Sequence, residues 1–332
     1  MKTIRKILII RFSSIGDIVL TTPVIRCLKT QLPGAEIHYL TKAAYLPLLS
    51  ANPHVTRIWA YDRNFGELIP LLRAGKFDFI VDLHKNFRSA FVRIRLGIRS
   101  AAFPKLNIRK WLAVRFKMDV LPDLHIVDRY FIAARPLGVV NDGKGLDCFI
   151  PARDEIEISA LPETHRDGYL AIVTGGKHNT KIFPPDKVAE VCTRLVLPVV
   201  LLGGSEDRER GAQIAAMGGS LVHNACGRYS ISQSASVIRQ SRAVMTNDTG
   251  LMHIAAAFGK PLVSVWGNTI PAFGMYPYMP GAPSAQSLIS EVNGLRCRPC
   301  SKLGYSECPE KHFRCMKDIE IGPIVGFLNR HF

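Results

Sequence analysis

Short apolar runs rich in β-branched residues alternate with longer amphipathic stretches through most of this chain of 332 residues. In the first half, strands are predicted at residues 7–11, 36–40, 57–61 and 77–83, and helices at residues 18–30, 43–50 and 65–74. A strand followed by a helix about every 25 residues is typical of a parallel sheet covered by helices. The sequence therefore predicts an α/β fold.

The same alternation starts again after a polar connector at residues 161–167. Strands are predicted at residues 169–174, 199–203, 220–223, 243–246 and 262–266, and helices at residues 186–195, 207–217, 230–240 and 251–258. We therefore expect two Rossmann-like domains, residues 1–160 and 161–317. The amphipathic tail, residues 318–332, is predicted to be a helix.

The formal net charge of +16 is large, whereas a hydrophobic fraction of 47% is ordinary for a globular protein. Ten lysines and arginines and no acidic residue lie between Asp82 and Asp119, interleaved with five phenylalanines and tryptophans. We refer to this stretch as the basic segment. Such a charge implies an anionic partner, which is a nucleic acid, a phosphorylated substrate or an acidic membrane surface.

The first apolar run, residues 7–10, is too short for the core of an export signal and is followed by Arg11. No apolar run reaches the roughly 18 residues that a membrane-spanning helix needs. We therefore expect a cytoplasmic protein, and in a reducing compartment its eight cysteines are not expected to form four disulfides.

The most informative local sequence is Asn247-Asp248-Thr249-Gly250, which lies between a buried apolar run and an alanine-rich helix. A strand, a tight polar turn and a helix place backbone N–H groups at the helix N-terminus, where an anion such as a diphosphate binds. His253 falls in the first turn of this helix and reaches the same anion. The same pattern also suits an ordinary strand–helix unit whose helix is capped by Asp and Thr.

Residues 11–18 form a comparable strand–turn–helix connection in the first domain, with Asp17 at the start of the helix. Ligands bind at the C-terminal edge of open parallel sheets, and Gly16 lets the backbone approach one closely. Asp17 is a candidate general base there. The alternative is that Asp17 only stabilises the helix dipole, an effect of roughly 0.3–1 kcal/mol. The turn does not match the Rossmann dinucleotide loop, and the chain contains no P-loop motif.

Two further polar loops follow predicted strands of the second domain. Residues 174–181 are rich in glycine and contain Lys177 and Lys181, which suit a phosphate. A flexible loop with solvated lysines has the same composition. Glu206, in the loop after the next strand, suits the hydroxyls of a ribose, although an acid at a helix N-terminus explains it equally well.

Taken together, these pieces resemble the heptosyltransferases of lipopolysaccharide core synthesis, glycosyltransferase family nine. The resemblance rests on residues 11–17 (RFSSIGD), 181–184 (KIFP), 202–206 (LGGSE) and 247–257 (NDTGLMHIAAA). It covers nearly the whole chain, in the family's order. The last of these pieces is quite specific, and the first strengthens it greatly.

The resemblance implies a GT-B fold, in which two Rossmann-like domains face each other across a cleft. The first domain would take the acceptor and the second the nucleotide-sugar, with the C-terminal helix packed back on the first domain. The implied reaction is inverting transfer of a heptose from ADP-L-glycero-D-manno-heptose, with no obligatory metal or other cofactor. A GT-B enzyme using another nucleotide-sugar and a non-catalytic basic binding protein are the alternatives.

The resemblance also implies roles for individual residues. Asp17 matches the family's catalytic base, and Lys181 matches the lysine that contacts the donor diphosphate. The donor-binding turn is matched by Asp248, Thr249, Gly250 and His253, and the acid near the ribose and adenine by Glu206. The family often has small hydroxyl residues where this chain has Gly176 and Lys177. Lys177 is therefore a second candidate phosphate contact, and this departure leaves room for a different donor.

The basic segment fits the acidic acceptor of such an enzyme, an inner-core lipid A at the cytoplasmic face of an anionic inner membrane. The residues assigned to the acceptor are Ser14, Gly16, Lys85, Arg88 and Arg93. The interleaved aromatic residues suit a peripheral position in the membrane interface. Mixed cations and aromatics also suit single-stranded nucleic acid, but the chain has no DNA- or RNA-binding signature, so we expect no such partner.

Four cysteines cluster near the C-terminus: Cys297, Cys300, Cys308 and Cys315. Four thiolates in two pairs are able to close a tetrahedral zinc site, whose role would be structural. The six residues between Cys308 and Cys315 exceed the usual spacing in zinc fingers. Reduced or paired thiols are the alternative.

Overall fold

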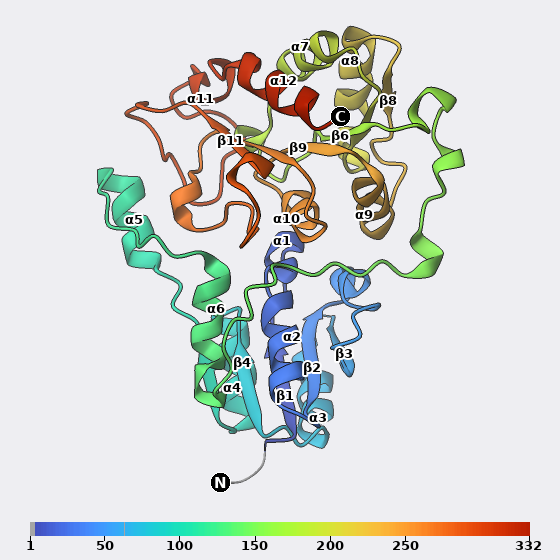
Figure 1. Ribbon diagram of the computed structural model, residues 1–332. Helices are drawn as coiled ribbons and strands as arrows, with labels where there is room; N and C mark the ends of the chain where they lie inside the picture. Colours follow the sequence, from blue (N-terminus) through green and yellow to red (C-terminus); the bar gives the residue numbers. More distant parts are fainter. Residues whose placement is uncertain (1–3, 63) are drawn as a thin grey trace. The chain divides into compact units, whose positions relative to one another are not determined.

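The computed structural model describes residues 4–62 and 64–332, and the chain divides into two compact α/β units (Figure 1). The first unit comprises Met1–Lys105 and Leu124–Pro151, and the second comprises Leu106–Asp123 and Ala152–Phe332. Residues 106–123 thus belong to the second unit and not to the expected first domain, and the chain returns to the second unit at Ala152, before the expected boundary at residues 160 and 161. The reason lies in the residues before the polar connector, where Glu155 accepts a hydrogen bond of 2.8 Å from Ser236 of the second unit.

The first unit contains a five-stranded parallel sheet in the order β3-β2-β1-β4-β5. Its strands are β1 (Lys6–Ile10), β2 (Glu36–Lys42), β3 (Arg57–Tyr61), β4 (Phe79–Asp82) and β5 (Ser100–Ala102). Its helices are α1 (Ile15–Val19), α2 (Thr22–Gln31), α3 (Phe65–Ala74), α4 (Phe87–Leu96) and α6 (Ile126–Ala134). Helices α3 and α4 cover one face of the sheet, and α2 and α6 cover the other (Figure 1).

Two helices of this unit differ from the sequence prediction. The single helix expected at residues 18–30 is divided into α1 and α2, and Pro23 lies in the first turn of α2. A proline is tolerated there because the first N–H groups of a helix have no partner within it. Residues 43–50 form only a 3₁₀ helix, Ala43–Leu48, because Pro47 cannot donate the backbone hydrogen bond that a longer helix needs.

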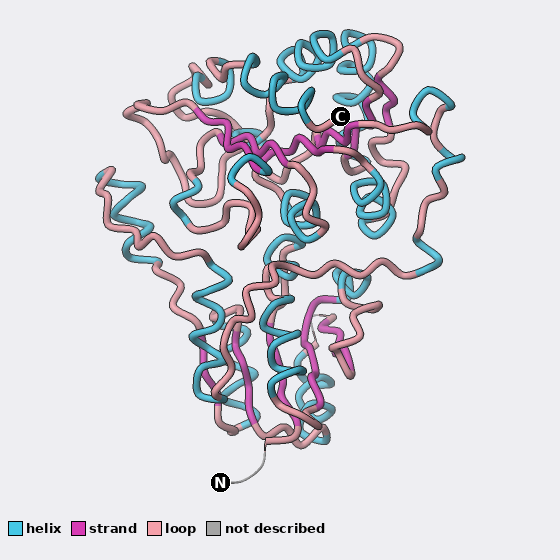
Figure 2. The backbone as a smooth tube through the Cα atoms, viewed as in Figure 1, coloured by secondary structure: helices cyan, strands magenta, loops and turns pink. Residues whose placement is uncertain are grey.

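The second unit contains a six-stranded parallel sheet in the order β11-β10-β9-β6-β7-β8, drawn in magenta in Figure 2. Its strands are β6 (Leu170–Val173), β7 (Val199–Leu202), β8 (Val222–Asn224), β9 (Ala243–Asn247), β10 (Leu262–Trp266) and β11 (Ser287–Glu291). Its helices are α5 (Asn107–Phe116), α7 (Pro185–Leu195), α8 (Arg208–Gly218), α9 (Ile231–Gln240), α10 (Gly250–Ala257), α11 (Arg314–Lys317) and α12 (Ile321–Arg330).

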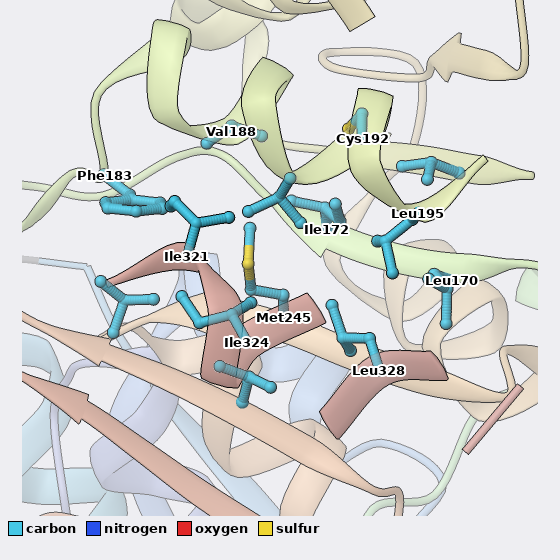
Figure 3. Packing of buried hydrophobic residues seen from close by; sticks show 14 of the residues in the cluster. Leu170, Ile172, Phe183, Val188, Cys192, Leu195, Met245, Ile321, Ile324 and Leu328 are labelled. Carbon is cyan, nitrogen blue, oxygen red and sulfur yellow. The ribbon is translucent and has the colours of Figure 1, made fainter. Parts of the chain in front are cut away.

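The core of the second unit lies between this sheet and the helices α7 and α12 (Figure 3). Ile172 and Met245 project from the sheet, Val188 and Leu195 from α7, and Ile324 from α12. We expected the C-terminal helix to pack back on the first domain. Its apolar face instead packs into the core of the second unit. The isoleucine, phenylalanine and leucine side chains of this face are removed from water there.

Membrane-spanning helices are not found in the part of the chain that the structure describes, since none of its helices has the necessary length and apolar composition.

Candidate active site

The turn after β1 is held together by an ion pair between Arg11 and Asp17. The guanidinium Nη2 lies 2.6 Å from Asp17 Oδ1, and the two side chains are 8% and 20% exposed. The same guanidinium donates to the carbonyl oxygens of Ser13 (2.8 Å) and Leu83 (2.5 Å). Asp17 Oδ2 accepts from the backbone N–H (3.1 Å) and the hydroxyl (2.9 Å) of Ser14. Asp17 is therefore fixed at the C-terminal edge of the first sheet, where the sequence predicted it.

This arrangement keeps the Asp17 carboxyl ionised. Burial acts to raise its pKa, but the positive charge of Arg11 and the hydrogen bonds from Ser14 and Arg11 outweigh burial, so its pKa lies below the ordinary value of 3.8. Burial, followed by the charge of Arg11, lowers the pKa of the neighbouring His84 to about 3. The imidazole is therefore neutral at physiological pH, and Arg11 is the cation that faces Asp17.

The loop after β4 lies beside this turn, since β4 and β1 are neighbours in the sheet. Asp82 is fully buried, and its carboxylate accepts hydrogen bonds from the backbone N–H groups of His84 and Lys85. The resulting turn presents the exposed side chains of Lys85 and Arg88. Arg93 is held differently, with Nη1 3.3 Å from Asp82 and Nε 3.1 Å from the Ser100 hydroxyl.

Of the five residues assigned to the acceptor, Lys85 and Arg88 therefore have exposed side chains on the same sheet edge as Asp17. Arg93 instead holds the loop that carries them. Ser14 and Gly16 lie in the turn itself, where the Ser14 side chain is engaged with Asp17. The basic segment as a whole does not form one surface of one unit. Lys85 and Arg88 belong to the first unit and the residues from Leu106 onwards to the second.

In the second unit, the loops after β6 and β9 are joined by side-chain contacts. Lys181 Nζ lies 2.5 Å from Asp248 Oδ2, and the side chains are 16% and 12% exposed. Asn247 accepts from the N–H of Phe183 (3.0 Å) and donates to the carbonyl of Gly175 (3.1 Å). Neighbouring strands thus bring the predicted lysine and the predicted Asp-Thr-Gly turn to one point on the sheet edge.

The turn after β9 opens helix α10 as the sequence predicted, with Thr249 in extended conformation at its N-cap. Thr249 and Gly250 are partly exposed there. His253 is only 2% exposed, because the first turn of α10 directs it into the protein. Its position in the first turn is as expected, and its contact with the donor stays a prediction.

The glycine-rich loops beside this turn are shaped by a buried carboxylate. Asp207 is 3% exposed and accepts a hydrogen bond of 2.9 Å from the N–H of Gly204. A Cβ on Gly175 would lie 2.1 Å from Asp207 Oδ2, and one on Gly203 would lie 2.7 Å from its Cβ. Both loops therefore need glycine in order to pass the carboxylate. The side chains of Lys177 and Glu206 are exposed on these loops and are available to a ligand.

The four clustered cysteines, Cys297, Cys300, Cys308 and Cys315, are not joined by disulfides in the part of the chain that the structure describes. Within residues 4–62 and 64–332, no group of three or more His, Cys, Asp or Glu side chains is placed to hold a metal ion. Burial raises the pKa of Cys300 to about 12 and that of Cys315 to about 11. The geometry thus does not provide the predicted zinc site.

Arg298, between the first two of these cysteines, has a clearer structural role. Its guanidinium donates to the carbonyl oxygens of Gly267 (2.5 Å) and Thr269 (2.9 Å) and pairs with Glu291 at 2.7 Å. Thr269 in turn donates a hydrogen bond of 2.8 Å to Asp248. The cysteine-rich loop therefore supports the Lys181–Asp248 pair from the side of β10.

Sequence reasoning did not assign roles to Arg11, Asn247, Asp207 or Thr269. The signal available for Arg11 was its position directly after the first strand, six residues before the candidate base. Asn247 is the last residue of β9, and Asp207 lies in the loop that follows β7. Polar residues at such positions are either ligand contacts or braces between loops, and the contacts described above identify these as braces.

The sequence is similar to one family of known proteins. Residues 66–307, more than half of the chain, match the sequence model of glycosyltransferase family 9 (heptosyltransferase). Lipopolysaccharide heptosyltransferase 2 of Salmonella typhimurium is 28% identical over 295 residues, which are 81% of this chain and 84% of that protein.

Solved structures share the fold. The glycosyl transferase family 9 structure from Veillonella parvula has a TM-score of 0.78 at 20% identity, covering 98% of this chain and 96% of that chain. The E. coli heptosyltransferase WaaC with ADP-2-deoxy-2-fluoro heptose has a TM-score of 0.68 at 19% identity, covering 98% of this chain and all (100%) of that chain. These likenesses, with the two parallel sheets, confirm the predicted α/β fold of the GT-B class.

Proposed function

Because this chain belongs to glycosyltransferase family 9, the heptosyltransferase family, and is thus a glycosyltransferase, we propose that it transfers a heptose from ADP-L-glycero-D-manno-heptose to a lipopolysaccharide inner-core acceptor. The observation that supports this proposal most is the junction of Lys181 with the Asp248-Thr249-Gly250 turn. A fold relative was solved with an ADP-heptose analogue, which favours an ADP-linked donor for this chain as well.

We assign the donor to the C-terminal edge of the second sheet. The N–H groups at the start of α10 and the cations Lys181 and Lys177 would bind the diphosphate. Glu206, exposed on the loop after β7, would accept hydrogen bonds from the ribose. Cations and backbone N–H groups stabilise the charge that develops on the departing ADP, so the reaction needs no metal at this point.

We assign the acceptor to the edge of the first sheet, with Asp17 as the general base. The acceptor hydroxyl would approach between Asp17 and the backbone at Ser14 and Gly16, and its phosphates would bind Lys85 and Arg88. Asp17 would take the proton as the hydroxyl oxygen attacks the anomeric carbon from the face opposite ADP, which inverts its configuration. The carboxylate would also stabilise the oxocarbenium-like transition state electrostatically.

This acceptor carries acyl chains, so we further propose that the enzyme works in the cytoplasm, in peripheral contact with the anionic inner membrane. The net charge of +16 supports such a contact, because cations near an anionic leaflet contribute roughly 1 kcal/mol each. Nucleic acid is not a proposed partner.

The first test is calorimetric titration with ADP-heptose, ADP, UDP and GDP in the absence of added metal. Binding of the two adenine compounds alone is the expected result. Preference for UDP or GDP would keep the glycosyltransferase but replace the donor by another nucleotide-sugar. Binding of ADP without transfer to a lipid A acceptor that carries the inner-core sugars would refute the proposed acceptor.

A further inference from the structure

Helix α5 of the second unit exposes its apolar side chains to solvent. Ile108 is 76% exposed, Trp111 56% and Phe116 57%, whereas the only fully buried residue of the helix is Ala113. Trp111 and Phe116 meet edge to face, with ring centroids 5.4 Å apart. A surface helix of a globular protein normally turns its apolar stripe towards the core. The outward stripe of α5 therefore needs a different explanation.

The cations of α5 fall into two groups. Lys117 donates hydrogen bonds to the carbonyl oxygens of Cys297 (3.0 Å) and Pro299 (2.7 Å), and Lys110 lies 5.4 Å above the ring of Phe273. These two lysines attach the helix to the second unit. Arg109 and Arg115 are exposed and flank the apolar stripe. The helix is thus anchored on one side and presents aromatic, aliphatic and guanidinium groups on the other.

An open hollow of about 900 Å³ lies between α5 and the cysteine-rich loop. Trp111 and Arg115 line it from α5, and Arg296, Tyr305 and Glu310 line it from the loop. Arg314 at the start of α11 also lines it and is paired with Asp318 at 2.7 Å. Leu303 on this loop is 60% exposed and Tyr305 42%. Apolar and cationic groups therefore continue from the helix onto the opposite wall.

From this surface we propose that α5 and the loop at residues 294–314 dock the protein on an anionic bilayer. Ile108, Trp111 and Phe116 enter the interface, and the arginines that flank them and line the hollow bind lipid phosphates. Tryptophan and arginine are suited to this boundary because each combines an apolar body with a polar end. The proposed function already includes contact with the membrane, and this inference assigns that contact to a specific surface. It rests on the proposed function, because it assumes an acceptor that is linked to lipid.

The charges favour a bilayer over a second copy of the chain. A protein of net charge +16 that meets its own copy through exposed arginines brings like charges together, which opposes association. Anionic lipid supplies the complementary charge, and its acyl region takes the apolar side chains. The exposed aromatic, aliphatic and guanidinium side chains of α5 thus match the acyl and phosphate parts of such an interface.

The position of the tryptophans gives a direct test. The chain has three, and Trp59 and Trp266 are only 7% and 1% exposed. Trp111 is therefore the tryptophan whose fluorescence reports on the surface. We expect its emission to shift to the blue, and to be quenched by brominated acyl chains, when vesicles containing phosphatidylglycerol are added. Vesicles of phosphatidylcholine alone should give a much smaller change, and high salt should weaken the effect.

Matched variants separate this surface from others. The double variant I108S/F116S should lower binding to phosphatidylglycerol vesicles about tenfold or more, since two apolar side chains no longer enter the interface. Leu71→Ser on α3 removes a side chain that is also 56% exposed and should leave binding unchanged. Three results would overturn the inference. The first is unchanged Trp111 emission while the protein floats with vesicles, and the second is an equal loss of vesicle binding in I108S/F116S and Leu71→Ser. The third is a shift of Trp111 emission that self-association or RNA causes instead of lipid.

Activity assays keep this inference distinct from the proposed function. With a deacylated, water-soluble acceptor, I108S/F116S should match the wild type, and it should lose transfer only when the acceptor is embedded in vesicles. Equal loss with both acceptors would overturn the docking role and leave the heptosyltransferase proposal standing. Absence of transfer by the wild type, with the lipid-dependent shift of Trp111 intact, would instead refute the proposed reaction.

Discussion

Arg11 and Asp17 form a 2.6 Å ion pair at the end of β1, and each of the two carboxylate oxygens of Asp17 has a hydrogen-bond donor from its own turn. A helix-capping aspartate needs only the contacts with Ser14. The additional buried guanidinium, itself held by the carbonyl of Leu83, fixes the carboxylate in one orientation. Such preorganisation suits a group that must receive a proton at a defined place.

Substitution of Asp17 by Asn should lower kcat by about 10²–10⁴, the range of a general base, with ADP affinity unchanged. Steady-state transfer assays and calorimetry with ADP test the two parts. Ser14→Ala serves as a control, because it removes one hydrogen bond to Asp17 and leaves the carboxylate in place. Near-normal turnover by Asp17→Asn would rule out its role as the base.

The pH dependence of transfer should report on the same ion pair. Because the pKa of Asp17 lies below its ordinary value of 3.8, the carboxylate stays ionised at neutral pH, and kcat/KM should fall only once the pH drops below that value. Arg11→Met removes the positive charge that lowers this pKa, so the acid limb should move to higher pH, and Arg11→Lys should lie between the two. An acid limb that is identical in all three proteins would contradict this account.

The two turns that the sequence placed correctly are set by local sequence. The capped turn at Asp17 and the Asp248-Thr249-Gly250 turn depend on a strand end followed by a helix start, and both are where the sequence indicated. The partners of these turns were not predictable in the same way. Arg11 reaches Leu83 because β4 happens to be the neighbour of β1, and strand order is a property of the whole sheet.

The basic segment shows a second limit of sequence reasoning. It is continuous in sequence and predicts a site for an acidic acceptor, but it is divided between two units after Lys105. The division depends on Lys117 meeting the carbonyls of the distant cysteine-rich loop. Similarly, the apolar stripe of the C-terminal helix was visible in the sequence, but its partner, α7, was not.

Gly175→Ala should weaken donor binding. Its new Cβ would stand 2.1 Å from Asp207 Oδ2, so the carboxylate or the loop that carries Lys177 and Lys181 must move, at a cost of about 1–3 kcal/mol. The expected result is a lower ADP affinity together with a lower thermal midpoint. Gly176→Ala is the matched control, because its Cβ would lie 3.1 Å from Cγ1 of Ile182, a much milder contact that a shift of a few tenths of an ångström relieves. Equal effects of the two substitutions would contradict the argument.

Asp142→Asn should destabilise the first unit in a pH-dependent way. A hydrogen bond from Arg26, opposed by burial, lowers the pKa of Asp142 from 3.8 to about 2. Since the folded-state pKa is depressed, its stabilising effect is present above pH 4 or so and is lost as the pH falls towards 2. Partial exposure (19%) limits that effect to about 1–2 kcal/mol.

Thermal unfolding of Asp142→Asn and wild type should therefore differ most at neutral pH and converge in acid. Glu190→Gln provides a control, because its pair with Lys187 (3.4 Å) is partly exposed on α7 and such surface pairs contribute about 0–1 kcal/mol. A midpoint difference that does not depend on pH would show that Asp142 acts through packing and not through its charge.

The pairing of Lys181 with Asp248 leads to a test by double substitution. Lys181→Met removes a cation from the diphosphate site and leaves the 12%-exposed carboxylate of Asp248 beside it, with Thr269 as its remaining hydrogen-bond donor. The variant loses a charged hydrogen bond between Lys181 and the diphosphate, which contributes about 1.5–3 kcal/mol. The unpaired Asp248 also repels the diphosphate, so ADP affinity should fall at least tenfold. The double variant K181M/D248N lacks the repelling charge and should recover part of this loss.

Calorimetry with ADP on the wild type, both single variants and the double variant gives the coupling directly. Lys177→Met gives the comparison at the second cation assigned to the diphosphate: its side chain is exposed, so the loss of ADP affinity should be smaller than for Lys181→Met and should shrink further as salt is added. If Asp248 instead contacts the donor itself, D248N alone will weaken ADP binding strongly and the double variant will bind worse than K181M. The sign of the coupling therefore decides whether Asp248 positions Lys181 or binds the nucleotide-sugar.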